Sequence, residues 1–290
     1  MSTILITGAD GTVGRDLVRL LRVAGADVRA GVHHLERPDS FPDVPRVLVD
    51  FSRPETLLTA MRGVTALYLL TPQVPQSVEY VRAAVSAAYQ AGVRRIIRQS
   101  VFNALAGVDE LSRWHRMAEL EIESSGVPCV FLRPNSFMQN FITIYRREIL
   151  GADRFRLPLG GARLSNVDVR DVADCAAVVL LDENLQGGSY ELSGPAALTG
   201  DEMALVLSEV AGREIVYVDA PEDEEGVPRD ETQQAVSEAL IELGLEMQTG
   251  ELATVTGAVP HLTGRVPLSF EQFARDYAWA WRRPDGAAPG

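Results

Sequence analysis

Lysine is absent from the sequence, so all 27 residues counted as lysine or arginine are arginines. Every reaction in which a lysine side chain takes part is therefore excluded. Positive charge is also scarce overall, because 40 aspartates and glutamates leave a formal net charge of −13. So acidic a chain is not expected to present the basic surface that nucleic acids bind, and we expect no nucleic-acid partner.

Cysteine, histidine and long apolar runs are scarce as well. The two cysteines, Cys129 and Cys175, lie far apart in apolar stretches and are predicted to be buried thiols in a reducing compartment. The four histidines show no spacing typical of metal ligands, so no metal site is expected. No apolar segment approaches the length of a membrane span, and no charged start precedes an apolar run. We therefore expect a cytoplasmic protein without membrane association.

The most informative segment that is present lies near residue 10. Ile4, Leu5 and Ile6 form a short run, rich in β-branched residues, that is typical of a buried parallel strand. Three glycines follow at G-x-x-G-x-x-G spacing, and a helical pattern of apolar residues begins there. Such a turn lets the backbone approach a pyrophosphate, which the helix N-terminus binds. The cofactor-binding residues predicted in this turn are Gly8, Asp10, Gly11, Thr12, Val13 and Gly14.

The end of the second predicted strand, residues 27–32, bears on the choice of dinucleotide. An NAD site usually has an acidic residue about 20 residues beyond the glycines. Here the strand ends in Gly31-Val-His-His34, without an acid. Arg29, His33, His34 and Arg37 cluster there instead and suit a 2′-phosphate, so NADP(H) is favoured over NAD(H). Alternatively, these side chains are merely solvated.

Strands and helices alternate through the first half of the chain. Strands are predicted at 4–6, 27–32, 46–49, 65–70, 94–99 and 127–132, and helices at 14–24, 54–62, 76–91 and 109–125. This alternation predicts an α/β fold, a Rossmann-type doubly wound parallel sheet with helices on both faces. Ligands of such sheets bind beyond the carboxyl ends of the strands. Further cofactor-binding residues are therefore predicted at Asp50, Phe51, Thr71, Pro72, Ser100, Pro134 and Asn135.

Beyond residue 150 the alternation loosens. Short strands are predicted at 190–192 and 215–218, and helices at 172–181, 199–211, 231–243 and 269–282. We predict a dinucleotide-binding core over residues 1–150 and a smaller C-terminal α/β substrate lobe over 151–283, partly interleaved with the core. The Pro/Gly/Ala-rich tail, residues 284–290, is expected to be flexible.

Several motifs along the whole chain carry a family resemblance. They are the turn at 7–14, Gly92-Val-Arg-Arg-Ile-Ile-Arg-Gln-Ser100, Trp114-His115-x-x-Ala118-Glu119, Ser125-Gly-Val-Pro128, Leu132-Arg-Pro-Asn-Ser-Phe-Met-Gln-Asn140, Val167-Asp-Val-Arg-Asp-Val172 and Gly264-Arg-x-Pro-x-Ser-Phe-x-x-Phe273. With these motifs the chain resembles NmrA-like proteins, atypical members of the short-chain dehydrogenase/reductase superfamily. In the relatives a basic residue, usually arginine, tends to occupy the position of His33, so this chain departs from the family pattern there.

The resemblance implies several functions. Similar proteins include NAD(P)H-dependent quinone reductases, natural-product reductases and regulators that bind the dinucleotide without turnover. We predict an NAD(P)H-dependent oxidoreductase that acts on a quinone or a polycyclic or aromatic carbonyl, with secondary metabolism as a plausible setting. The alternatives are a dinucleotide-sensing regulator and a non-redox enzyme that dehydrates or cyclises its substrate. The expected partner is a flat, aromatic small molecule, and the chain is expected to be a monomer or homodimer.

The missing lysine also shapes the expected catalysis. Ordinary short-chain dehydrogenases use a Tyr-x-x-x-Lys pair, which cannot exist here. Another group donates the proton, or the hydride passes directly to a strongly oxidising ring, or no hydride transfer takes place. Ser100 matches roughly the superfamily's catalytic serine and either polarises a carbonyl or caps a strand end. His115, whose imidazole titrates near working pH, is the strongest candidate for a general acid. Alternatively, its ring is bonded to a backbone carbonyl.

The segment 135–140 mixes amides with large apolar groups and is expected to line the floor of a pocket for a flat substrate. Core packing is the alternative interpretation for its apolar members and their neighbours. The predicted substrate-binding residues are Phe102, Asn103, Trp114, His115, Phe137, Met138 and Asn140.

Overall fold

A seven-stranded parallel sheet organises the protein, whose computed structural model describes residues 3–37, 40–220 and 230–283. Its strands are β1 (Thr3–Thr7), β2 (Asp27–Val32), β3 (Arg46–Leu48), β4 (Val64–Leu69), β5 (Arg95–Gln99), β6 (Cys129–Pro134) and β8 (Gly188–Leu192). They lie in the order β3-β2-β1-β4-β5-β6-β8, and all neighbours are parallel. The order reverses between β1 and β4, which is where such sheets open a crevice for ligands. The predicted Rossmann-type sheet is confirmed.

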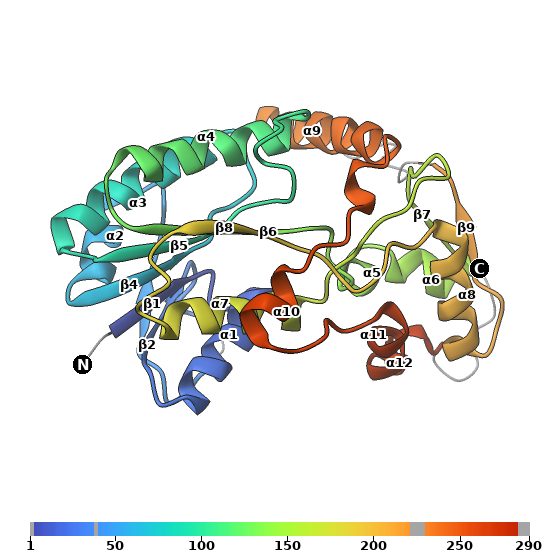
Figure 1. Ribbon diagram of the computed structural model, residues 1–290, viewed down its shortest axis with the longest axis horizontal. Coiled ribbons are helices and arrows are strands. Elements are labelled where there is room, and N and C mark those ends of the chain that lie inside the picture. Colours follow the sequence, from blue (N-terminus) through green and yellow to red (C-terminus); the bar gives the residue numbers. More distant parts are fainter. Residues whose placement is uncertain (1–2, 38–39, 221–229, 284–290) are drawn as a thin grey trace.

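Helices cover both faces of this sheet (Figure 1). One face packs on α1 (Thr12–Val23) and α7 (Val169–Leu181), the other on α2 (Pro54–Met61), α3 (Ser77–Ala91) and α4 (Glu110–Ser124). In β1, Ile4 and Ile6 enter the first layer and Leu5 enters the second, and all three are buried. Burial of both faces explains why this strand is apolar throughout rather than alternating. Outside these layers, α9 (Glu231–Met247) packs on α4, and α10 (Ala258–Thr263) packs on α7.

A smaller group of elements gathers at one end of the sheet, where β6 ends (Figure 1). It contains α5 (Asn140–Thr143), α6 (Arg146–Ala152), β7 (Arg154–Arg156), α8 (Gly200–Ala211), β9 (Val216–Val218), α11 (Phe270–Asp276) and α12 (Ala278–Trp281). Aromatic packing forms its core: the Phe141 ring lies 5.0 Å from Phe155 and 4.9 Å from Phe270, centroid to centroid. By contrast α7 and β8 pack with the main sheet, although they follow residue 150.

Several elements differ from the sequence prediction. The expected helix at 269–282 is broken at Tyr277 into α11 and α12, and α9 runs four residues further than expected. The short elements α5, α6, β7, α10 and the 3-10 turn at Glu251–Ala253 were not predicted, because three to seven residues show no periodicity. The predicted tail, 284–290, lies outside the described residues. Across the described ranges, no helix combines the length and apolar character that a membrane crossing requires.

Candidate active site

The glycine turn between β1 and α1 has the close packing that its spacing predicts. Gly8 adopts φ +65°, in the left-handed region that favours glycine, and its carbonyl accepts a hydrogen bond from the Gly11 N–H at 2.9 Å. A Cβ on Gly14 would lie 2.2 Å from the Gly8 carbonyl oxygen and 2.8 Å from the Ala9 Cα. The first turn of α1 can therefore approach the end of β1 only because residue 14 is glycine.

The N-terminus of α1 has no internal partner for its first N–H groups. Gly11 is the N-cap residue, no side chain caps the helix, and its first turn contains no acidic residue. Free N–H groups and the positive end of the helix dipole make such a terminus an anion site. The turn therefore fits the pyrophosphate of a dinucleotide. Val13 is buried in the core, so only its backbone can face such a ligand, whereas Thr12 is exposed.

Arg29 does not lie where the sequence prediction put it. Its Nη1 donates to the carbonyl oxygens of Ala60, at 2.6 Å, and Arg62, at 3.0 Å, at the end of α2. Because α2 runs antiparallel to the strands, that end lies at the edge of the sheet opposite the glycine turn. The predicted contact between Arg29 and a 2′-phosphate is therefore wrong, and Arg29 instead stabilises the C-terminus of α2.

The other members of the predicted 2′-phosphate cluster do lie beyond the carboxyl end of β2. His33 is exposed, and its ring packs edge-on against His34 with centroids 4.6 Å apart. Arg46 of β3 holds the loop by donating to the His34 and Arg37 carbonyls. Glu36, which the sequence prediction did not weigh, lies 2.9 Å from His34 Nδ1. The loop thus presents a carboxylate as well as cations.

The remaining predicted cofactor residues lie along the same edge of the sheet. Asp50, after β3, accepts hydrogen bonds from Ser52 and from Arg53 Nε at 2.9 Å, which together lower the pKa of its carboxyl. Phe51 stacks on Tyr80 with ring centroids 5.8 Å apart. Thr71 and Pro72 follow β4, Ser100 follows β5, and Pro134 ends β6.

Asn135 has a structural role instead. Its Nδ2 donates to Ser165 Oγ at 2.8 Å and to the Leu252 carbonyl at 2.9 Å, while its Oδ1 accepts from the Ser136 N–H. These bonds tie the end of β6 to two later segments of the chain. Both amide hydrogens are used and the side chain is buried, so the predicted cofactor contact of Asn135 is corrected to a structural role.

A buried polar cluster lies between the sheet and α4. Glu119 accepts two hydrogen bonds from Arg133, both at 2.8 Å, and one from Arg116 at 3.0 Å. Burial alone would raise the pKa of Glu119, but these bonds hold it below its usual value. The Ser100 hydroxyl faces Glu119 and also lowers this pKa, although its geometry does not meet that of a hydrogen bond. His115, one helical turn before Glu119, and Arg98 of β5 complete the cluster and are 5% and 1% exposed. Arg98 was missed in the sequence, although a charge within the apolar run of a predicted strand was a usable signal.

His115 lies in this cluster, but not in the state that the sequence suggested. Burial lowers its pKa well below 6.5, and the positive charge of Arg98 lowers it further. The imidazole is therefore neutral at working pH, and the expectation of an acid that titrates near neutrality is wrong. Its Nδ1 is buried and has no hydrogen-bond partner among the described residues, so the alternative of a ring bonded to a backbone carbonyl through this atom is also not observed.

Most of the predicted apolar substrate contacts are packed in cores. Phe102 and Met138 belong to the core of the smaller group of elements, and Trp114 packs against Ala239 of α9 while its Nε1 donates to Glu110. Phe137 and Asn140 remain half-buried. A cavity beside Met138, lined also by Leu164 and Phe270, has a volume of ≈ 20 Å³, which is too small for an aromatic substrate. Core packing, the alternative interpretation, thus holds for Phe102, Trp114 and Met138.

A second buried acid near the site was not predicted. Asn103 (φ +56°) follows Ser100 in the β5–α4 loop, and its Nδ2 donates to Glu246 Oε1 of α9 at 3.3 Å. The Glu246 carboxyl also shares a hydrogen bond with Asp109, the N-cap residue of α4. Burial, followed by the Asp109 carboxylate, raises the pKa of Glu246 to about 8. At neutral pH this pair holds one proton and joins α9 to the N-terminus of α4.

The Glu246 proton predicts a pH-dependent stability. Because the folded pKa is about 8 and the ordinary value is 4.5, the folded state binds this proton more tightly than the unfolded state. Its contribution to the free energy of unfolding is complete below pH 4.5 and is lost as the pH rises through 8. We therefore expect the melting temperature to fall between pH 6.5 and 9. Each 1 kcal/mol of unfolding free energy that is lost should lower it by about 2–4 °C.

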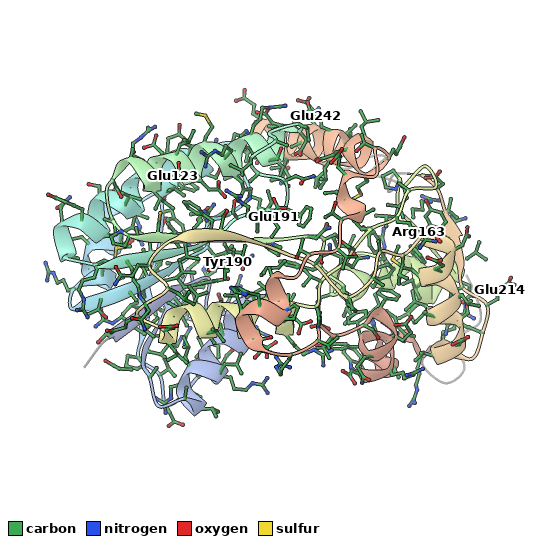
Figure 2. All side chains as sticks on the ribbon, in the orientation of Figure 1. Glu123, Arg163, Tyr190, Glu191, Glu214 and Glu242 are labelled. Carbon is green, nitrogen blue, oxygen red and sulfur yellow. The ribbon has the colours of Figure 1, made fainter. Side chains whose placement is uncertain are left out.

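Scanning calorimetry of the wild type and Glu246→Gln across this range measures the effect. The amide keeps the form of the protonated acid, so the fall should largely vanish. Glu242→Gln is the matched control, since Glu242 is an exposed residue of the same helix (Figure 2). An unchanged pH slope in Glu246→Gln would show that Glu246 is not the responsible group.

Comparison with known proteins places the chain in a family. The model of the NmrA-like family matches residues 1–248. NAD(P)H azoreductase of Xenophilus azovorans is 31% identical over 288 residues, covering 96% of this chain and 99% of that protein. (4-Alkanoyl-5-oxo-2,5-dihydrofuran-3-yl)methyl phosphate reductase of Streptomyces griseus is 34% identical over 289 residues, with 96% and 99% covered.

A solved structure shares the fold. The NADPH-dependent quinone oxidoreductase of Escherichia coli, in complex with NADPH, aligns with a TM-score of 0.84 and 22% identity, covering 94% of this chain and 99% of that one. The family model covers the motifs from the glycine turn to Val172, and the two relatives align over nearly the whole chain. The chain belongs to the NmrA-like family.

Proposed function

We propose that the chain is an NAD(P)H-dependent reductase that acts on a quinone or an aromatic carbonyl. One observation carries the proposal: the uncapped N-terminus of α1 and the unpartnered polar atoms of Thr71, Ser100 and His115 lie on one edge of the sheet, across the switch point between β1 and β4. The first element fits a pyrophosphate, and the others offer polar groups to a reacting oxygen. The reductases among the relatives support the same class of reaction.

Each part of the site has a role in this reaction. The backbone of the glycine turn binds the pyrophosphate, and the ends of β4 and β5 place Thr71 and Ser100 beside the substrate. A bound dinucleotide supplies a hydride, which carries two electrons and one proton. Neutral His115 can donate one N–H hydrogen bond but cannot act as a cationic acid near pH 7. A quinone suits such a site, because its reduction needs less help from an acid than that of a simple ketone.

The test is the oxidation of NADPH by the purified protein with a panel of quinones, azo dyes and aromatic ketones, followed at the absorbance of the reduced nicotinamide. Quinone-dependent oxidation is the expected result. NADPH that binds but is never consumed would overturn the proposal and favour a sensor or a non-redox enzyme. Failure to bind NADPH or NADH would contradict all three.

We infer further that NADP(H) is preferred over NAD(H). His33 and Arg37 lie beyond β2, where one of them can hold a 2′-phosphate through a single charge-assisted hydrogen bond, which is worth about 1.5–3 kcal/mol. NADPH should therefore bind about tenfold to a hundredfold more tightly than NADH. Glu36 opposes this preference, so Glu36→Gln should widen the difference and Arg37→Ala should narrow it. Fluorescence titration of both cofactors measures it, and equal dissociation constants in the wild type would refute it.

A further inference from the structure

Unpartnered buried polar atoms concentrate at one place in the molecule. Among the described residues, five buried side-chain nitrogen or oxygen atoms have no hydrogen-bond partner, and four of them are Thr71 Oγ1, Arg98 Nε, Ser100 Oγ and His115 Nδ1. Buried polar groups are normally satisfied, because leaving one unpaired costs free energy. Four such atoms from three neighbouring elements therefore indicate a site built for a ligand atom.

The sheet register brings these side chains to one face. Leu69 of β4 pairs with Arg98 of β5, and alternation directs Arg98 and Ser100 to the same side as Leu69 and, two residues on, Thr71. That side is the one that α4 covers, and His115 lies on the buried face of α4. Arg98 Nη1 donates to the Leu69 carbonyl at 3.3 Å, which places the guanidinium at the carboxyl end of β4.

The cluster also carries an uncompensated positive charge. Glu119 is occupied by Arg133 and Arg116, at 2.8 and 3.0 Å. Arg98 forms no ion pair within the described ranges, and burial lowers the pKa of its guanidinium only to about 10, so it stays charged.

Other charges packed against α4 point elsewhere. Arg82 of α3 pairs with Glu121, and Glu242 of α9 pairs with Arg113, both on the exposed side of α4 (Glu242 is labelled in Figure 2). Glu246 of α9 is held by Asn103 and Asp109 at the N-terminus of α4. Among the described residues Arg98 therefore has no ion-pair partner of its own, and the Glu119 carboxylate, which acts on it through space, is shared with Arg133 and Arg116.

We propose that Thr71, Arg98, Ser100 and neutral His115 form a buried oxyanion site. Arg98 supplies the fixed positive charge of this site, since the chain contains no lysine. The proposal rests on the proposed function and names the atom that the site takes: the oxygen of the substrate carbonyl or quinone. The hydroxyls and Arg98 Nε–H are donors, and a neutral imidazole can donate one more hydrogen bond. Donors fixed in a buried site stabilise a developing oxyanion without reorganisation.

The reaction balances with this assignment. Hydride addition forms a C–H bond at the carbonyl carbon, or an O–H or C–H bond on a quinone, and the π pair of a C=O bond moves onto an oxygen. The substrate gains two electrons, and NAD(P)H, the reductant of the proposed function, loses them. The oxyanion then takes one proton from water. A site with excess positive charge favours the anion over the neutral substrate, which is the preference that transition-state stabilisation requires.

The test uses 4-nitrophenol, whose absorbance reports its ionisation, and its uncharged analogue 4-nitrotoluene. The wild-type protein, with and without NADP⁺, should bind the phenolate form at least tenfold more tightly than 4-nitrotoluene and should lower the apparent pKa of the bound phenol. Arg98→Met should lose both effects. Arg98→Lys should restore part of the preference, because it restores the charge. Arg94→Met, an exposed arginine just before the same strand, is the matched control and should bind as the wild type does.

Two further variants test the site without removing Arg98, whose loss could also affect folding. Ser100→Ala and Thr71→Val remove single hydroxyls and should each weaken phenolate binding severalfold while leaving the affinity for 4-nitrotoluene unchanged. Equal binding of phenolate and 4-nitrotoluene by the wild type, or a full phenolate preference in folded Arg98→Met, would overturn the oxyanion site. Quinone reduction without a preference for phenolate would refute the oxyanion site but not the proposed function. Phenolate binding that depends on Arg98, without any NADPH oxidation, would refute the proposed function but not the anion site.

Discussion

Replacing Gly11 with valine should abolish the binding of NADPH and NADH while the protein remains folded. Gly11 has φ −78° and ψ 178°, an extended conformation that valine adopts readily, and a Cβ there would lie 3.1 Å from the Gly8 carbonyl oxygen. The larger side chain would stand at the N-terminus of α1, where the pyrophosphate must meet the free N–H groups. Loss of at least about 3 kcal/mol of binding energy corresponds to more than a hundredfold in the dissociation constant.

Fluorescence titration with both cofactors measures this loss, and thermal melting checks the fold. The melting temperature should change by no more than about 2–4 °C, the equivalent of about 1 kcal/mol. Gly151→Val is the matched control, because Gly151 is exposed in α6 and a Cβ there meets no atom within 4 Å. Gly14 is unsuitable for this test, since even alanine would collide with the Gly8 carbonyl. Wild-type affinity for both cofactors in a folded Gly11→Val protein would show that the dinucleotide does not bind at the N-terminus of α1.

The architecture could be predicted because its determinants are local. Six strands of the main sheet contain a short apolar stretch, and the intervening helices end at clear signals such as Gly92 at the end of α3. A parallel sheet then follows from the alternation alone. The short elements of the smaller group depend on aromatic packing, such as Phe141 between Phe155 and Phe270, and nothing local specifies them.

The site was only partly predictable, for a different reason. The places of the strand ends and of the glycine turn in the sheet follow from topology and could therefore be predicted. The direction of a side chain is decided by its neighbours: Arg29 turns to the end of α2, and Asn135 ties β6 to later segments. The pKa of Glu246 depends on Asp109, 137 positions earlier in the chain (246 − 109), a contact that no sequence spacing reveals.

Replacing His115 with alanine should lower the turnover of an aromatic ketone by about a hundredfold and that of a quinone by less than about tenfold. Removing one donor from an oxyanion site costs roughly 10²–10³ in turnover when the oxyanion is localised. The negative charge of a reduced quinone is delocalised over an aromatic ring and needs less stabilisation. Steady-state kinetics with both substrates, with cofactor affinity measured separately, test this difference. His261→Ala, which removes an exposed histidine of α10, is the control.

The pH profile distinguishes a neutral donor from a cationic acid. Because burial and Arg98 hold the pKa of His115 well below 6.5, the active neutral form persists above that pH. Ketone turnover in the wild type should therefore stay level between pH 8 and 6.5 and fall only at more acid pH, as the imidazole takes up a proton and the buried cluster gains a second uncompensated charge. A catalytic imidazolium would give the opposite slope, with turnover rising as the pH falls through neutrality. That slope, or equal losses for ketone and quinone in His115→Ala, would show that His115 does not act as a neutral donor to the substrate oxygen.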